Sequence, residues 1–296
     1  MKLLLSASCL TLLAFVLLGA PPGNLPNLSN LEGAPADTIS ITYLNLDHEA
    51  NFHKVRRAFE AAPRLRNADV ILLQEVAHVE GGLSIANRLA SWLNYSVAFS
   101  PEGPRVYDRG LAVVSKFPIE DSSVKWLTPY NLHFKTRHRF ALAVKLRVPA
   151  GELRIWNAHL DSRINPEQRL GQLQPVMDDA AKLTGLRLIG GDFNTNDFYW
   201  IDHVLPIPHG GGYRSAVRRA MAKLGFETPF EDRLVTLPIA RQHLDWLFVN
   251  GLEPLSSGAE SIPFSDHHAI WAAFRVVRGS QVHALSQTLD KGWRGN

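Results

Sequence analysis

The sequence predicts a mixed α/β fold, and three observations support this fold class. The 296 residues are 46% hydrophobic and 20% charged, which is a typical composition for a globular protein. Short apolar segments of strand length alternate along the chain with segments of helical spacing, as mixed α/β proteins require. No segment of roughly 20–50 residues repeats, which excludes solenoid and propeller folds.

Alternation, continuous apolar runs and helical spacing define the first elements. Residues 39–44 alternate and are rich in β-branched side chains, which predicts a strand, whereas residues 52–62 have helical spacing that stops at Pro63. The run at residues 70–73 is apolar throughout and predicts a buried strand, and residues 83–93 predict a second helix. Three further apolar runs predict strands at residues 111–114, 141–146 and 153–158.

The same signals continue in the second half of the chain. Residues 169–183 predict a helix, and residues 186–189 predict a buried strand that ends in two glycines. Residues 213–224 predict a helix that ends at Gly225. Two late strands are predicted at residues 244–249 and 269–274. The long aromatic segment at residues 198–212 is interpreted as a loop, either functional or a plain surface connection.

The two ends of the chain differ in composition from the middle. A short positive start followed by an apolar stretch predicts that residues 1–20 are an export signal peptide or an uncleaved membrane anchor. Residues 21–37 are rich in Pro, Asn and Gly and predict a linker. Residues 38–276 then form the folded domain, and residues 277–296 form a basic tail. We therefore expect an exported protein, periplasmic or secreted, or one attached to a membrane by its first residues.

Charge and cysteine usage narrow the chemistry. The net charge is +3, but residues 275–296 carry four basic residues and one acidic residue, and residues 1–36 are balanced, so residues 37–274 are neutral. A neutral domain weakens the case for a broadly basic nucleic-acid groove. Cys9 is the only cysteine and lies in the predicted export segment. Cysteine catalysis, cysteine-bound zinc and disulfides within the domain are therefore excluded.

Several polar side chains lie at the ends of the predicted apolar strands. They are Asn45, Glu75, His159, Asp192, Asn194, Asp245, Asp266 and His267. Each alone is compatible with a structural role, such as a turn cap, a solvated strand end or a satisfied core histidine. Buried carboxylates are costly unless they are paired or bound to a metal, so the whole set predicts one convergent site.

The composition of this set restricts the chemistry. Oxygen ligands from Asn45, Glu75 and Asp266 suit Mg²⁺ or, alternatively, Mn²⁺ or Ca²⁺. The two histidines and the remaining acids can transfer protons and stabilise charge. The sequence contains no Gly-x-Ser-x-Gly elbow, no His-Glu-x-x-His motif and no Gly-Lys-Ser/Thr phosphate loop. Metal-assisted hydrolysis of a phosphate ester is the chemistry that survives these exclusions.

Five short motifs occur in an order that is familiar. They are LLQEV at residues 72–76, NAHLDSR at 157–163, GGDFNTND at 190–197, HLDWLFV at 243–249 and SDHHAI at 265–270. With these motifs the chain resembles the endonuclease/exonuclease/phosphatase superfamily, of the deoxyribonuclease I-like type, from about residue 38 to residue 274, which is nearly all of the domain expected at residues 38–276. The resemblance implies a four-layer α/β sandwich, in which two packed mixed β-sheets are flanked by helices. It also implies that this domain is catalytic.

The resemblance further implies roles for individual residues. Glu75 would be the principal metal ligand, with Asn45 and Asp266 nearby. Asp192 would orient or deprotonate the attacking water, and Asn194 would hold a phosphate oxygen.

Two histidines and their neighbours complete the implied catalytic set. His159 would donate a hydrogen bond to a phosphoryl oxygen, and His267 would be the second imidazole, held by Asp245. Which histidine is the acid and which is the base stays open.

Substrate contacts are implied at Arg139, which would bind phosphate, and at Tyr107 and Asp108. Asp108 would support His159, or the segment at residues 104–109 is a surface turn. The expected reaction is hydrolysis of phosphodiester bonds by a monomer.

Nucleic acid is the first candidate substrate, and lipid headgroups or small phosphate esters are the alternative. The apolar segment at residues 198–208 is the feature that favours lipid, although no long exposed apolar hairpin is evident in it. An inactive binding module would have lost site residues, and this chain retains them all.

Overall fold

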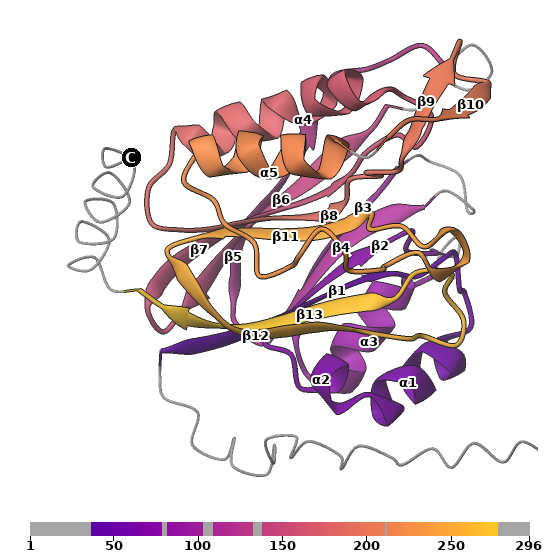
Figure 1. Ribbon diagram of the computed structural model, residues 1–296. Helices are drawn as coiled ribbons and strands as arrows, with labels where there is room; N and C mark the ends of the chain where they lie inside the picture. Colours follow the sequence, from indigo (N-terminus) through magenta and orange to yellow (C-terminus); the bar gives the residue numbers. More distant parts are fainter. Residues whose placement is uncertain (1–36, 79–81, 103–108, 133–137, 211, 278–296) are drawn as a thin grey trace, which may run out of the picture. The chain divides into compact units, whose positions relative to one another are not determined.

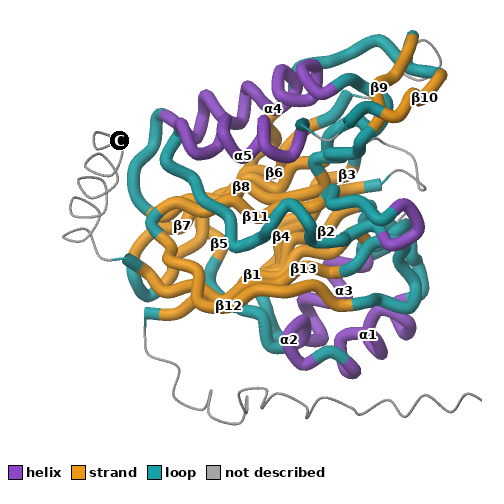
Figure 2. Tube along the Cα trace, viewed as in Figure 1, coloured by secondary structure: helices purple, strands orange, loops and turns teal. Residues whose placement is uncertain are grey.

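Two β-sheets pack face to face, and helices cover the outer face of each sheet (Figure 1). Helices α1, α2 and α3 lie on one side, and helices α4 and α5 lie on the other side (Figure 2). The predicted four-layer α/β architecture with two mixed sheets is confirmed.

The computed structural model describes residues 37–78, 82–102, 109–132, 138–210 and 212–277. All of them belong to one compact unit, residues 36–296. Among them, no helix is both long enough and apolar enough to span a bilayer. The predictions for residues 1–36, for Tyr107 and Asp108, and for residues 278–296 concern parts of the chain outside the described residues.

The first sheet has six strands. In spatial order they are β12 (Leu252–Glu260), β13 (Ala269–Val276), β1 (Thr38–Asn45), β2 (Val70–Gln74), β4 (Gly110–Ser115) and β3 (Ser96–Pro101). The second sheet has five strands. They are β11 (Asp245–Asn250), β8 (Leu186–Asp192), β7 (Gly151–His159), β6 (Phe140–Val148) and β5 (Ile119–Trp126). In each sheet one central pair is parallel, β1 with β2 and β7 with β8, and the other pairs are antiparallel.

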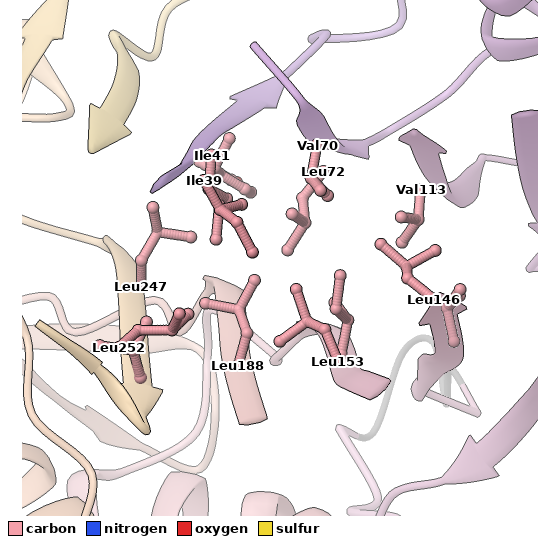
Figure 3. Close-up of a cluster of buried hydrophobic side chains, with 14 of the residues drawn as sticks. Ile39, Ile41, Val70, Leu72, Val113, Leu146, Leu153, Leu188, Leu247 and Leu252 are labelled. Carbon is pink, nitrogen blue, oxygen red and sulfur yellow. The ribbon is translucent and has the colours of Figure 1, made fainter. Parts of the chain in front are cut away.

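The space between the sheets is filled by alternate side chains of the strands. Ile39 and Ile41 of β1 point from the first sheet toward Leu153 of β7 and Leu188 of β8 in the second (Figure 3). All four are essentially inaccessible to solvent. Because successive side chains of a strand face opposite sides, the intervening residues of the central strands pack outward against the helices. This double burial explains why the central strands read as continuous apolar runs.

The helices begin at sequence signals that are visible in the chain. Helix α1 (Phe52–Ala61) is capped by Asn51, whose side chain accepts a hydrogen bond from the His53 amide at 3.0 Å. Pro63 then begins a short helix, α2 (Pro63–Arg66), and α3 (Ile85–Leu93) is capped by Ser84. On the second sheet, α4 (Pro166–Ala181) starts three residues before its predicted boundary, and α5 (Tyr213–Lys223) follows. A capping box between Asn165 and Gln168 fixes the start of α4.

The structure corrects the prediction for residues 198–212. Residues 198–208 are not an irregular loop, because β9 (Phe198–Ile201) and β10 (Leu205–Pro208) pair as an antiparallel hairpin separate from both sheets. Residues 198–201 are all aromatic or β-branched, which favours a strand, but the two prolines of β10 obscured the second strand. Three sheet strands without a predicted counterpart, β3, β5 and β12, all lie at sheet edges.

Candidate active site

Strand topology brings the candidate residues to one edge of both sheets. The parallel strands β1, β2, β7 and β8 all run toward this edge, where they end near Asn45, Glu75, His159 and Asp192. The antiparallel strands β4, β6, β11 and β13 begin at the same edge. In the second sheet His159 is in register with Asp192, and Asp192 is in register with Asp245. Residues far apart in the sequence are therefore neighbours on adjacent strands.

Two buried amides, Gln74 and Asn157, link the sheets directly beneath this edge. The Gln74 Nε2 donates to the Ala158 carbonyl at 2.6 Å and to the Asn157 Oδ1 at 3.1 Å, and the Asn157 Nδ2 donates to the Leu73 carbonyl at 2.9 Å. Both side chains are fully buried. Their signal in the sequence is an uncharged amide inside each of two apolar runs, VILLQ and RIWNA. These hydrogen bonds fix the spacing between the two sheets at the edge where the candidate residues lie.

Gly191 permits this close approach. Its φ is +139°, and a Cβ at this position would lie 1.9 Å from the Ala158 carbonyl oxygen and 2.5 Å from the Gln74 Nε2. Both the backbone angle and the space exclude a side chain. The second glycine of the GGD motif is therefore required by the packing of Gln74 against β8.

A pocket of about 530 Å³ opens at this edge. Among the predicted residues, those that line it are Asn45, Glu75, Arg139, His159, Asp192, Asn194, Asp266 and His267. Asp245 is fully buried and contacts His267 from behind. Three ionisable lining residues were missed by sequence reasoning: Asp47, His48 and Arg109.

Glu75 lies at the centre of the acidic side of the pocket. It directly follows β2 in a left-handed conformation with φ of +52°, which turns its carboxylate into the pocket. Arg109 donates to one carboxylate oxygen at 2.6 Å, and His48 Nε2 is 2.9 Å from the other. Burial alone would raise the pKa of Glu75, but the hydrogen bond from His48 and the neighbouring cationic groups outweigh it and hold the pKa well below its usual range.

A tight turn after β1 adds Asp47 and His48 to the acidic side. Both residues have positive φ, +44° and +61°, and the Asp47 amide donates to the Asn45 Oδ1 at 2.9 Å. The ligand atoms of Asp47, His48 and Glu75 all lie within 4.8 Å of one another. Burial, together with the carboxylates of Asp266 and Glu75, raises the pKa of Asp47. The sequence signal for this turn was only Asn-x-Asp-His, which is typical of ordinary turns as well.

His159 and Asp192 form the buried floor of the pocket. The His159 Nε2 is 3.7 Å from the Asp192 Oδ2 and 4.0 Å from the Glu75 Oε1. Burial, and then the nearby charge of Arg139, lowers the pKa of His159 well below its usual value. Burial and the neighbouring Asp245 carboxylate raise the pKa of Asp192. Asn194 caps this carboxylate by donating its amide hydrogen at 2.8 Å.

His267 is held by Asp245 and faces Asp192. The His267 Nδ1 is 2.8 Å from the Asp245 Oδ2, and its Nε2 is 4.0 Å from the Asp192 Oδ2. Burial alone would lower the pKa of His267, but the Asp245 carboxylate reverses this effect and raises the pKa to about 10. Because the carboxylate fixes Nδ1 as a donor, the Nε2 edge is presented to the pocket.

Arg139 is buried at the pocket wall between two carboxylates. Its Nε donates to the Asp161 Oδ1 at 3.0 Å, and its Nη1 donates to the Glu102 Oε1 at 2.9 Å. Gln172 of α4 donates to the second oxygen of Asp161 at 2.8 Å. This network fixes the segment after β7, and it leaves Arg139 less able to bind phosphate than the sequence suggested.

The arrangement combines an oxygen-rich group with two histidines. Asn45, Asp47, Glu75 and Asp266 line one side of the pocket, and the mutual repulsion that raises the Asp47 pKa would be relieved by a bound cation. These residues therefore fit a hard divalent cation. The opposite side supplies two imidazoles and Asp192, which can accept or donate protons.

The sequence matches the model of the Endonuclease/Exonuclease/phosphatase family over residues 42–267. That range includes all of the candidate residues that line the pocket. No curated protein matches the sequence.

Solved structures of low sequence identity share the fold. An endonuclease/exonuclease/phosphatase from Beutenbergia cavernae DSM 12333 aligns with a TM-score of 0.63 at 16% identity, covering 81% of this chain and 72% of that one. The human Nocturnin catalytic domain with bound sulfate anion aligns with a TM-score of 0.60 at 18% identity, covering 81% and 95%. Truncated Caenorhabditis elegans TDP2 aligns with a TM-score of 0.55 at 20% identity, covering 81% and 98%.

Proposed function

Because this chain belongs to the endonuclease/exonuclease/phosphatase family, we propose that it hydrolyses phosphodiester bonds with the aid of a divalent cation. One observation carries the proposal. An oxygen-rich group around Glu75 faces His159, Asp192 and His267 across a single pocket. Glu75 is paired with Arg109 and His48, but Asp47 and Asp266 add further carboxylates close to it at a solvent-accessible opening, and this excess of negative charge suits a cation.

The cation would be held by Glu75, Asp47 and Asp266, with Asn45 beside them. Mg²⁺ is the proposed ion and Mn²⁺ or Ca²⁺ are the alternatives, since carboxylate and amide oxygens suit all three. When bound, such an ion polarises a phosphoryl oxygen and neutralises the negative charge that develops in the transition state. Arg109 already supplies a positive charge to Glu75 at 2.6 Å, so it competes with the ion for this carboxylate.

The chain's own residues supply the proton transfers and the remaining hydrogen bonds. Asp192, buried and close to both imidazoles, would accept the proton of the attacking water. His159 and His267 would donate hydrogen bonds from Nε2 to the phosphoryl oxygens, and Asp245 keeps His267 in the orientation that allows this. The backbone amide of Asn194 donates a hydrogen bond that positions the Asp192 carboxylate. Asn194 would also contact a phosphate oxygen.

Nucleic acid is our first proposal for the substrate. The pocket is open at the domain edge, and Arg163 lines it, which suits a phosphate backbone. Arg109 and Arg139 also line it and are paired with carboxylates. The second candidate is a lipid headgroup phosphodiester. It is favoured by one specific observation, the exposed apolar hairpin of β9 and β10 next to the pocket.

A substrate panel tests these proposals. The purified protein is incubated with plasmid DNA, RNA, phospholipid vesicles and a soluble generic phosphodiester, each with Mg²⁺ and with EDTA. Cleavage of the generic ester only in Mg²⁺ supports the reaction, and metal-dependent plasmid nicking supports the nuclease. Equal hydrolysis in EDTA would contradict the metal requirement, and activity confined to lipid would overturn the nuclease.

A further inference from the structure

One face of the β9–β10 hairpin is apolar and exposed. Ile201 pairs with Leu205 and Tyr199 pairs with Ile207, so these four side chains lie on the same face of the two-stranded ribbon. Their exposed fractions lie between 42% and 57%, and Val204 at the turn is 55% exposed. A contiguous patch of this kind is unusual on a soluble domain and indicates a surface that is covered in use.

The other side of the hairpin is attached to the rim of the pocket. Asn165 accepts a hydrogen bond from the Trp200 amide at 2.6 Å and donates to its carbonyl at 3.3 Å. The Arg163 guanidinium lies over the Trp200 ring at 5.7 Å, and the Arg163 carbonyl is 2.7 Å from the His203 Nδ1. Arg163 itself lines the pocket. Whatever binds the apolar face is therefore held beside the active site.

The hairpin projects from the rest of the domain (Figure 1), and its turn has a defined geometry. Its turn has two residues with positive φ, Asp202 at +49° and His203 at +60°, and the Val204 amide donates to the Ile201 carbonyl at 2.9 Å. Positive φ at both central positions is the turn geometry that suits the twist of a tight hairpin. The apolar face is thus held in a fixed orientation and does not depend on a partner to form.

The outer edge of β10 is closed to strand addition. Pro206 and Pro208 occupy alternate positions opposite Trp200 and Phe198. Proline has no backbone N–H, so the positions that would present donors outward present none. A protein partner or a second copy that added a strand here would find no donors. The same feature lowers the cost of moving the edge into an apolar medium, where unpaired N–H groups are expensive.

We propose that the apolar face of the hairpin docks on a phospholipid bilayer and holds the pocket at the lipid surface. Each strand has four residues, or about 13 Å at ~3.3 Å per residue, which is enough to reach the boundary between headgroups and acyl chains. The domain from residue 37 to residue 274 carries no net charge, so docking is driven by apolar burial and is insensitive to salt. Phosphodiesters of the lipid headgroup layer would then lie next to the pocket. That they are cleaved there rests on the proposed function.

Site-specific fluorescence tests the docking. The full chain with Cys9→Ser carries one new cysteine, Ile201→Cys or Ile207→Cys, labelled with a polarity-sensitive dye. Leu255→Cys, equally exposed but in β12 of the first sheet, is the matched control. With phosphatidylcholine vesicles we expect a blue shift at 201 and 207 in low and high salt, and none at 255. Because the readout is local, binding by the apolar segment at residues 3–20 does not imitate it.

The contrary outcomes are distinct. No shift at 201 and 207, or an equal shift at 255, would overturn docking through the hairpin. A shift at 201 without vesicles, in a dimer seen by sedimentation, would overturn it in favour of a second copy.

Activity provides an independent measurement with the double variant Ile201→Asp, Leu205→Asp. We expect hydrolysis of vesicle-borne phosphodiester to fall at least about tenfold, the loss expected when one large apolar side chain can no longer be buried. Hydrolysis of a soluble phosphodiester should stay unchanged, and an equal fall on both substrates would overturn the docking role. If wild type cleaves neither substrate the proposed function fails, and the fluorescence result still decides the docking.

Discussion

Replacing Gln74 with alanine tests the view that buried amides hold the two sheets together at the active edge. Gln74 is fully buried and its side chain takes part in four hydrogen bonds. Two of them run from its Nε2 to the second sheet, at Ala158 and Asn157. Its Oε1 accepts from the Tyr43 hydroxyl at 3.1 Å and from the Asp192 amide at 3.2 Å.

The magnitude follows from the groups that lose a partner. In Gln74→Ala four buried groups each lose one hydrogen bond: the Ala158 carbonyl, the Asn157 Oδ1, the Tyr43 hydroxyl and the Asp192 backbone amide. Each unsatisfied buried group costs about 1–3 kcal/mol, and some partners re-pair, so we expect a loss of about 3–5 kcal/mol in the free energy of unfolding. That is a large part of the ~5–15 kcal/mol that stabilises an ordinary domain.

Urea unfolding followed by circular dichroism measures this loss. Gln174→Ala is the matched control, because Gln174 lies on the exposed face of α4, where its side chain donates to Asp178 at 2.7 Å. Its stability should change by less than about 0.5 kcal/mol. A loss below about 1 kcal/mol in Gln74→Ala would refute the bridging role. So would strict additivity with Asn157→Ala, since contacting residues should couple.

Three further predictions concern acid stability, catalysis and metal binding. His243 is buried, and its Nε2 is hydrogen-bonded to the Asp245 carbonyl at 2.9 Å. Burial lowers the pKa of His243 to about 4. Between pH 6.5 and pH 4 the unfolded state therefore binds more protons than the folded state, and the free energy of unfolding falls as the pH drops. Wild type should lose about 2 kcal/mol more than His243→Gln between pH 8 and pH 5 in urea titrations, and equal losses would contradict this. Asp245→Asn should keep the fold and lower turnover of a generic phosphodiester at least about 100-fold, because His267 loses its charged partner; full activity would disprove that role. Mg²⁺ at about 100 times its Kd should raise the Tm of wild type by roughly 5–10 °C. The same Mg²⁺ concentration should raise the Tm of Asp47→Asn by less, and identical shifts would exclude Asp47 as a ligand.

The interior of the fold was predictable from the sequence, whereas three of the four strands at the edges of the two sheets were not. The central strands β2 and β8 are buried on both faces, so they appear as unbroken apolar runs. Strand β5, with the sequence IEDSSVKW, is exposed along most of its length because it lies at a sheet edge. Strand β12 contains proline and glycine, which edge positions tolerate. These edge strands have less to bury, and their sequences therefore carry less of the apolar signal. The edge strand β11 was predictable because most of its residues are buried.

The candidate site shows a similar division. Residues at the ends of apolar strands, such as His159 and Asp192, were predictable because a polar group next to a buried run is unusual. Asp47 and His48 were missed because turn residues are commonly polar, and only their positive φ and their approach to Glu75 distinguish them. The ion pairs of Arg139 were also invisible, since Glu102 and Asp161 are distant in the sequence.

Turnover by a Glu75→Gln variant tests the central claim most directly. Thermal unfolding first establishes that purified wild type, Glu75→Gln and the surface control Glu60→Gln have the same Tm. Their turnover of a soluble phosphodiester is then compared with Mg²⁺ and with EDTA. We predict metal-dependent hydrolysis by wild type and by Glu60→Gln, and a rate at least about 100-fold lower for Glu75→Gln. A folded Glu75→Gln protein that hydrolyses the ester at the wild-type rate would contradict the account.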